Sequence, residues 1–223
     1  MNQHFDNFNQ LLDNRYSCRA FSNKTVDEDI INKIIQSAQK VPSWCNSQPW
    51  EIDLLKPDTM RLLSEKLLEH DETTDWEDAD IDFPKKYRGI LKIRRAICGS
   101  QLYRSLGIGR DDKESYKEAF LNNYRFFGAP NVAIITTPKD LGAYGALDCG
   151  SFVTAFTLAA TSLGIASIPQ AAIAGRSAIV REVLNISEER NILCAISFGY
   201  EVDLPVNRFR TERASFKEFV KWK

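Results

Sequence analysis

The chain has 223 residues, 43% of them hydrophobic, and a formal net charge of -1, which allows one sizeable core and predicts a single domain over residues 1–223. A charge this close to zero creates no global field that would draw the chain onto nucleic acid or an anionic membrane. No apolar run approaches the roughly 20 residues that a membrane span needs. Five single cysteines without a Cys-x-x-Cys pair suit reduced thiols, so we expect a cytoplasmic protein.

The first third of the chain predicts helices on either side of one strand. Apolar residues at helical spacing predict an N-terminal helix that ends near Asn14. A capping box at residues 25–28 predicts the start of a second helix, which stops before Pro42. Residues 50–55 alternate in the way of a strand, and residues 59–69 return to a helical pattern.

Residues 69–112 are predicted to form a lid or insertion, because the chain is acidic over residues 69–82 and basic over residues 85–95. One interpretation is a pair of solvated faces, and another is a segment that guards a site and attracts an anionic substrate. In the second interpretation the candidate substrate contacts are Tyr87, Arg88, Arg94 and Arg95. A third interpretation, nucleic-acid binding by the basic residues, is weakened by the adjacent acidic stretch, which would repel phosphates.

The second half of the chain alternates predicted strands with helices. Short apolar or β-branched runs predict core strands at residues 132–137, 165–168 and 192–198. Residues 148–163 are apolar on nearly all sides and predict a buried helix, closed by Gly164 as a left-handed cap. Ser177 can cap a further helix. The last segment, residues 201–223, ends in apolar side chains that should pack on something, and a partner subunit is a plausible surface.

The residues with chemical potential form two short, turn-rich clusters, at residues 15–19 and 42–50. Phosphate-loop, nucleophile-elbow and His-Glu-x-x-His motifs are absent, and the chain has only two histidines. Demanding chemistry is therefore expected to come from a cofactor. The two clusters supply guanidiniums, hydroxyls and amides, which can hold a polar, phosphorylated ring system such as a flavin.

The arginines of the first cluster match the charge of a flavin phosphate. Bidentate, charge-assisted hydrogen bonds would come from Arg15 and from one C-terminal arginine, Arg208 or Arg210, and the Ser17 hydroxyl would complete the set. Arg19 could supply a cation near the flavin N1 and O2 atoms, where negative charge gathers on reduction. Alternatively, these arginines pair with acidic residues at the surface.

The amides of the second cluster match the donors and acceptors of a pyrimidine ring or the ribityl hydroxyls, a role that suits Asn46 and, less directly, Gln48. Alternatively, both amides organise the turns between two prolines. Trp44 and Trp50 fit core or interface positions as readily as a substrate platform.

The order of these clusters resembles the nitroreductase family of flavoproteins. Residues 15–21 look like its Arg-x-Ser-x-Arg/Lys-x-Phe element, and residues 42–50 look like its Pro-Ser-x-x-Asn-x-Gln-Pro-Trp signature. Its later landmarks follow at residues 127–130 and 163–169, so the resemblance spans nearly the whole chain. The Ser-Trp-Cys-Asn variant, with residues 107–112, is similar to the branch that includes nitrobenzoate reductases.

This resemblance implies an α+β fold with a mostly antiparallel central sheet flanked by helices, and a homodimer with FMN at the interface. The C-terminal extension would wrap the partner subunit. The loop at Pro169 would lie against the flavin, although its Gln170 and Ala171 depart from the Glu-Gly of some relatives. The candidate cofactor-binding residues are Arg15, Tyr16, Ser17, Arg19, Pro42, Ser43, Trp44, Asn46, Gln48, Pro169, Gln170, Ala171, Arg208 and Arg210.

The resemblance also implies an activity: an FMN-dependent oxidoreductase that uses NADH or NADPH to reduce nitroaromatic or similar electron-poor aromatic or quinone substrates. Nicotinamide and substrate would alternate at the flavin, and no protein residue would act as a covalent catalyst. The alternatives are another chemistry on the same fold, such as enone or quinone reduction or reductive dehalogenation, and a non-catalytic flavin-binding protein.

Overall fold

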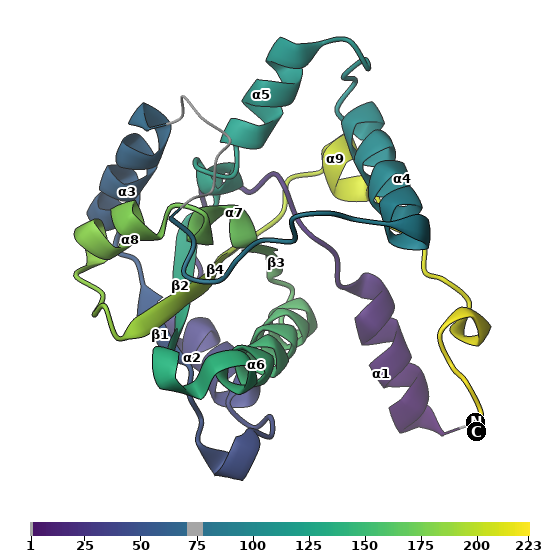
Figure 1. Cartoon of the computed structure of the whole chain (residues 1–223), viewed down its shortest axis with the longest axis horizontal. Coiled ribbons are helices and arrows are strands. Elements are labelled where there is room, and N and C mark those ends of the chain that lie inside the picture. The colour runs from purple at the N-terminus through teal and green to yellow at the C-terminus, as the bar shows by residue number, and fades with distance from the viewer. Residues whose placement is uncertain (1, 71–77) are drawn as a thin grey trace.

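The fold is built on one antiparallel sheet with helices on both faces (Figure 1). The computed structural model describes residues 2–70 and 78–223, and within them the sheet has four strands in the order β1-β2-β4-β3. The strands are β1 Glu51–Leu54, β2 Asn131–Pro138, β3 Ala166–Gln170 and β4 Arg190–Gly199. Each neighbouring pair is antiparallel, which confirms the predicted α+β class.

Most of the helices lie where the sequence predicted them, with boundaries shifted by a few residues, whereas the helices at residues 89–105 and 113–121 were not predicted. The longer ones are α1 Gln3–Asn14, α2 Glu28–Ala38, α3 Pro57–Glu69, α4 Gly89–Ser105, α5 Lys113–Leu121, α6 Gly142–Ser162 and α8 Ser177–Leu184. The short ones are α7 Ala171–Ala174 and α9 Pro205–Arg208, with single 3-10 turns at Trp44–Asn46, Phe126–Gly128, Lys139–Leu141 and Phe216–Glu218.

Strand β2 divides the core in two, because its successive side chains point to opposite faces of the sheet. Ala133 and Ile135 join the cluster under α2 and α6, whereas Val132 and Ile134 join the cluster under α3 and α8. Both faces of the central strands are therefore covered, and β2 reads as a continuous apolar run rather than an alternating one.

Two helix starts differ from the sequence prediction. The capping box at residues 25–28 does not form: the N-cap of α2 is Asp27, and its side chain makes no capping hydrogen bond. Ser177 is the first residue of α8 rather than its cap, and its hydroxyl donates to the carbonyl of Ala174 at 2.9 Å. The prediction for Gly164 is confirmed, since its φ of +73° is the left-handed conformation that glycine adopts without a steric penalty.

Helix α6 is longer than predicted and is buried along one side only. Its inner face carries Phe152 and Phe156, which pack into the cluster under α2. Its outer face carries Tyr144 and Leu147, whose relative exposures are 58% and 65%. An evenly apolar helix with one exposed side is the pattern of an element that a second protein surface can cover.

Three further segments stand apart from the sheet. Figure 1 shows α1, α4 and the C-terminal segment together on one side of the molecule. Neither α1 nor α4 has a buried residue, and the C-terminal segment has exposed aromatic side chains. The exposed apolar side chains of these segments include Phe5, Phe8, Ile90, Leu91, Ile93, Phe216, Phe219 and Trp222.

The segment between α3 and α4 is fixed to the body by a buried ion pair. Arg181 of α8 donates two hydrogen bonds to the carboxylate of Asp80, at 2.8 and 2.9 Å, and the backbone N–H of Ile192 donates to the same carboxylate at 2.7 Å. Part of the predicted acidic stretch, residues 71–77, lies outside the described residues. In the part of the chain that is described, no helix has both the length and the apolar character that membrane crossing needs.

Candidate cofactor pocket

The first cluster lies along the edge of the sheet. After α1 ends, residues 15–19 run extended beside β3, with a bridge between Ser17 and Ser167 and a 3.1 Å hydrogen bond from the Cys18 N–H to the Ser167 carbonyl. Cys18 is fully buried. Because side chains alternate along an extended segment, Ser17 and Arg19 point away from the side that Cys18 fills.

The C-terminal segment is held against this cluster by the buried amide of Asn207. Its carbonyl oxygen accepts the backbone N–H of Arg19 at 2.8 Å, and its NH₂ group donates to the carbonyls of Ala20 and Val202, both at 2.8 Å. Its own backbone carbonyl accepts Nη1 of Arg210 at 2.6 Å. One asparagine thus joins residues nearly 190 positions apart and places Arg210 beside the first cluster.

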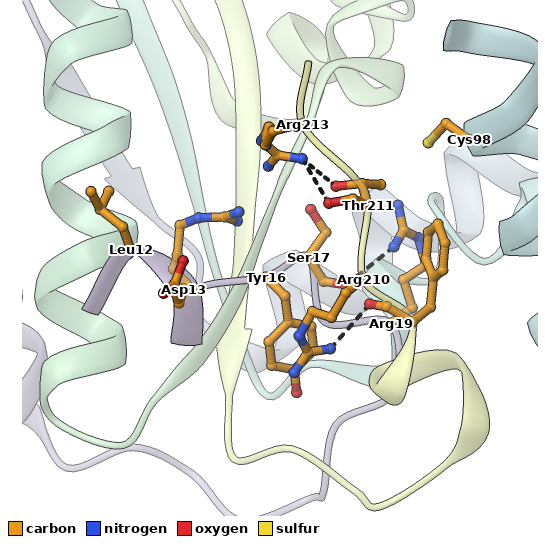
Figure 2. A pocket seen from close by; sticks show the side chains of 11 residues that line it. Leu12, Asp13, Tyr16, Ser17, Arg19, Cys98, Arg210, Thr211 and Arg213 are labelled. Carbon is orange, nitrogen blue, oxygen red and sulfur yellow. Dashed lines mark hydrogen bonds between the residues drawn. The ribbon is translucent and has the colours of Figure 1, made fainter. Parts of the chain in front are cut away.

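The two segments enclose a cavity of about 640 Å³. Figure 2 shows its side chains, which come from the end of α1, from residues 15–19, from α4 and from the C-terminal segment. The lining residues are Leu12, Asp13, Arg15, Tyr16, Ser17, Arg19, Cys98, Phe209, Arg210, Thr211 and Arg213. All four candidate residues of the first cluster, with Arg210, therefore share one cavity.

The cavity concentrates positive charge. Burial lowers the pKa of Arg15, and the neighbouring guanidiniums of Arg213 and Arg210 lower it further. Burial likewise lowers the pKa of Arg19. Among residues 2–70 and 78–223, no carboxylate forms an ion pair with any of these four arginines. Four guanidiniums that repel one another, with the carboxylate of Asp13 also in the cavity wall but in no ion pair with them, suit an anionic ligand that carries more than one charge.

Hydroxyl and aromatic groups complete the cavity wall. The guanidinium of Arg210 lies 3.7 Å from the centre of the Tyr16 ring, and the Tyr16 hydroxyl is hydrogen-bonded to Glu201. Arg213 donates to the hydroxyl of Thr211 at 2.6 Å. Such a set of planar cations and hydroxyls fits a phosphate ester with a polyhydroxy chain.

A second, smaller cavity of about 210 Å³ adjoins the first, since Arg19 lines both. Pro169, Gln170 and Ala171 line it together with Tyr103, whose ring lies 4.0 Å from that of Tyr116. The side chain of Gln170 is turned into the core: its Nε2 donates to the Asn123 carbonyl at 2.9 Å, and its Oε1 accepts the Ser197 hydroxyl. This loop can thus offer a ligand its backbone rather than the Gln170 amide.

The second predicted cluster is not brought to either cavity of the same chain. Trp44 instead lies at the start of α6, where its N–H donates to Asp148 at 3.0 Å and its ring lies 5.2 Å from that of Tyr144. Asn46 and Gln48 have φ values of +56° and +48°, and the Gln48 N–H donates to Ser43 Oγ at 2.9 Å. Pro42 precedes this turn and lines neither cavity. The side-chain amide of Gln48 also stays within this turn, since its Nε2 donates to the Asn46 carbonyl at 3.4 Å.

The remaining candidates separate from one another. Arg208 is exposed, makes two hydrogen bonds to Asp203 at 2.7 and 2.6 Å, and does not line the first cavity, whereas Arg210 does. Arg94 donates to Glu218 at 2.9 Å. The other three predicted substrate residues, Tyr87, Arg88 and Arg95, line a third cavity of their own.

Several residues at the site were not singled out from the sequence: Tyr103, Asn207, Thr211 and Arg213. Arg213 follows Arg208 and Arg210 in one arginine-rich stretch, so the spacing of that stretch was the available indication. Nothing in the sequence indicated the role of Asn207, because that role depends on hydrogen bonds to residues 19 and 20, which are distant in the chain.

The fold and the cavity define an α+β protein with an arginine-lined pocket for a large anionic ligand. Comparison with known proteins narrows this class: the sequence model of the Nitroreductase family matches residues 12–200. The chain is 35% identical over 218 residues to the nitroreductase NfnB of Mycolicibacterium smegmatis, which covers 96% of this chain and 91% of that protein. It is 29% identical over 219 residues to a 4-nitrobenzoate reductase of Pseudomonas putida, covering 96% and 95%.

Solved structures agree. The FMN-dependent nitroreductase NfnB from Mycobacterium smegmatis, in complex with NADPH, superposes with a TM-score of 0.90 at 34% identity over 99% of this chain and 100% of that one. The chain therefore belongs to the nitroreductase family, as its motifs predicted.

Proposed function

We propose that this chain is a cytoplasmic FMN-dependent oxidoreductase that takes reducing equivalents from NADH or NADPH and reduces nitroaromatic or similar electron-poor aromatic or quinone compounds. The observation that carries the proposal is the convergence of Arg15, Arg19, Arg210 and Arg213 on one cavity without a paired carboxylate. Family membership and relatives described as FMN-dependent nitroreductases support the choice of ligand.

The cavity residues fit the parts of FMN in order. Arg15, Ser17 and Arg210 would bind the phosphate, with Arg213 and Thr211 beside them, and the Tyr16 ring would hold Arg210 in place. Arg19, which lines both cavities, would lie beside the pyrimidine edge of the ring system. When bound, FMN supplies the hydride-accepting ring, and the protein supplies orientation and electrostatics.

The second cavity would receive the stacked substrate. The backbone at Pro169, Gln170 and Ala171 forms one wall and Tyr103 another, so an aromatic compound could lie flat against the ring system. Nicotinamide and substrate would use this space in turn, which makes the reaction an alternation of two half-reactions. Holding each partner at the ring in the correct orientation is the main catalytic contribution of the chain.

We further propose a homodimer in which each cofactor site is completed by the partner chain. Pro42, Ser43, Trp44, Asn46 and Gln48 lie away from the arginine cavity of their own chain, so they would reach the cavity of the other copy. The exposed outer face of α6, the exposed α1 and α4, and a C-terminal segment that wraps the partner would form the interface. In this arrangement residues 69–112 act as a lid on a single-domain subunit.

The test is an absorbance spectrum of the purified protein, followed by anaerobic addition of NADH or NADPH and then a nitroaromatic compound. We expect flavin bands that bleach with the nucleotide and recover with the acceptor. Bleaching that recovers only with enones, quinones or halogenated aromatics would assign another chemistry on the same fold. Flavin bands that never bleach would leave a flavin-binding protein without turnover, and a protein that stays colourless after incubation with FMN would refute the proposal.

A further inference from the structure

The third cavity is a cationic surface that is separate from the cofactor pocket. It encloses about 710 Å³ and is lined by Pro84, Lys85, Lys86, Tyr87, Arg88, Gly89, Lys92 and Arg95. Five of these eight residues are cations, and no carboxylate among the described residues lines the cavity. We call this surface the basic pocket.

Little within the described chain neutralises the basic pocket. Lys85 is 3.4 Å from Asp82, in an exposed pair that contributes little, and Arg95 lies 5.2 Å from the centre of the Tyr87 ring. Lys86, Arg88 and Lys92 make no ion pair with the other residues of the ranges 2–70 and 78–223. The first turn of α4 also carries no acidic residue. A cavity in which several cations have no ion pair with the described residues suits a group with two or more negative charges.

The basic pocket and the second cavity lie along one face of α4. Arg88, Lys92 and Arg95 are four and three residues apart, so they lie on one face of the helix. Leu102, which lines the second cavity, follows Arg95 by seven residues, or two helical turns, and therefore lies on the same face. With a rise of about 1.5 Å per residue, the two sites are roughly 10 to 20 Å apart along the helix. Arg95 also acts electrostatically on Tyr103, whose pKa is raised by burial and by Tyr116 and is lowered by Arg19 and Arg95.

The distance between the basic pocket and the second cavity indicates which kind of anion the basic pocket can bind. A carboxylate on a benzene ring that is stacked in the second cavity would lie within that cavity, and the two sites share no lining residue. A dinucleotide, in contrast, has its nicotinamide at one end and its adenosine at the other. From the geometry we propose that the basic pocket binds the 2′-phosphate of NADPH and makes this chain prefer NADPH to NADH. The inference rests on the proposed function, which requires one of these two nucleotides.

The decisive variant neutralises the three cations that have no ion pair: Lys86→Gln, Arg88→Gln and Lys92→Gln together. The matched control removes the same charge elsewhere, through Lys33→Gln, Lys40→Gln and Lys56→Gln, which are exposed residues outside the three cavities. Both variants are first checked by thermal melting, so that a loss of folding is not mistaken for a loss of binding. The binding probe is adenosine 2′,5′-bisphosphate, compared with adenosine 5′-monophosphate by calorimetry on the protein as purified.

We expect the unaltered protein and the control to bind the bisphosphate at least tenfold more tightly than the monophosphate, and the pocket variant to lose most of that preference. In steady-state assays, KM for NADPH should rise about tenfold in the pocket variant, whereas KM for NADH should change less than twofold. If the unaltered protein binds both probes equally, or if the pocket variant keeps the preference, the inference is wrong. A change confined to 4-nitrobenzoate, with neutral nitroaromatics and both nucleotides unaffected, would assign the pocket to an anionic substrate and would also overturn it.

The calorimetric arm separates this inference from the proposed function. A protein that lacks FMN and oxidises neither nucleotide, but prefers the bisphosphate, would refute the oxidoreductase proposal and leave the phosphate site supported. A protein that oxidises both nucleotides with equal KM values and binds both probes equally would support the oxidoreductase proposal and refute the site.

Discussion

The guanidinium of Arg210 lies 3.7 Å above the centre of the Tyr16 ring, so the second residue of the first cluster holds a cation from the far end of the chain. We expect Tyr16→Leu to weaken FMN binding roughly two- to fivefold, because an exposed cation–π contact contributes about 0.5–1 kcal/mol. Tyr16→Phe keeps the ring and removes the hydrogen bond to Glu201, so it should bind FMN almost normally. Quenching of FMN fluorescence measures the affinity of both variants. Equal losses of affinity would show that the Tyr16 ring does not contribute to FMN binding.

Because the pocket arginines repel one another, Arg213 should lower the stability of the FMN-free protein and strengthen the binding of FMN. Arg213→Gln removes a charge that lowers the pKa of Arg15, so the cofactor-free protein should melt at the same or a slightly higher temperature. FMN affinity should fall about tenfold, and its dependence on salt should weaken. Arg208→Gln, outside the pocket and paired with Asp203, is the control and should leave FMN affinity unchanged. A larger loss in Arg208→Gln would reverse the choice of phosphate ligand.

The amide of Asn207 should be important for both stability and cofactor binding. Asn207→Ala removes three buried hydrogen bonds to residues 19, 20 and 202, and we expect it to lower the free energy of unfolding by about 2–4 kcal/mol. FMN binding should weaken as well, because Arg19 and Arg210 lose their shared anchor. Urea denaturation gives the stability, and Asn131→Ala, whose side chain makes one long hydrogen bond of 3.4 Å, is the comparison. Similar losses in both variants would argue against an anchoring role.

The ion pair of Asp80 with Arg181 should be the most sensitive contact of the segment before α4. Both side chains are about nine-tenths buried, so Asp80→Ala leaves an uncompensated guanidinium and should destabilise the protein by about 3–5 kcal/mol. Asp82→Ala, which removes the exposed partner of Lys85, should have little effect on the denaturation midpoint. Limited proteolysis should then cut near residue 80 in the first variant only. Resistance to cleavage would mean that other contacts fix this segment.

The cysteines should divide into two reactivity classes. Burial raises the pKa of Cys18 and of Cys149 to about 11 and that of Cys194 to about 12, whereas Cys45 and Cys98 are exposed. At pH 8, alkylation followed by mass spectrometry should spare Cys18, Cys149 and Cys194 until the protein is denatured, because burial keeps these thiols protonated. Because the folded protein holds these protons above the ordinary pKa of 9.0, their contribution to stability is complete below pH 9 and is lost as the pH rises towards 11. Stability that is constant from pH 9 to 11 would contradict this.

By itself, the sequence determined the fold class, most helices and strands, the family and the arginine cluster at residues 15–19. These depend on local patterns: an apolar period marks a helix or strand, and a short motif keeps its residue types wherever the chain folds. Local patterns were insufficient at the start of α2, where Asp27 rather than Thr25 is the N-cap, and along α6, where apolar composition did not reveal the exposed face.

Only the tertiary structure decided which charges share a cavity. Arg210 lies in the cavity with Arg15, because it contacts Asn207 and the Tyr16 ring. Arg208 does not, because it is paired with Asp203. The structure also separated the cluster at residues 42–50 from the first cluster. Within the basic stretch, Arg94 pairs with Glu218, whereas Arg88 and Arg95 line a separate cavity. Such choices depend on contacts between residues far apart in the chain, and electrostatic energies depend on distance and burial, which residue order does not contain.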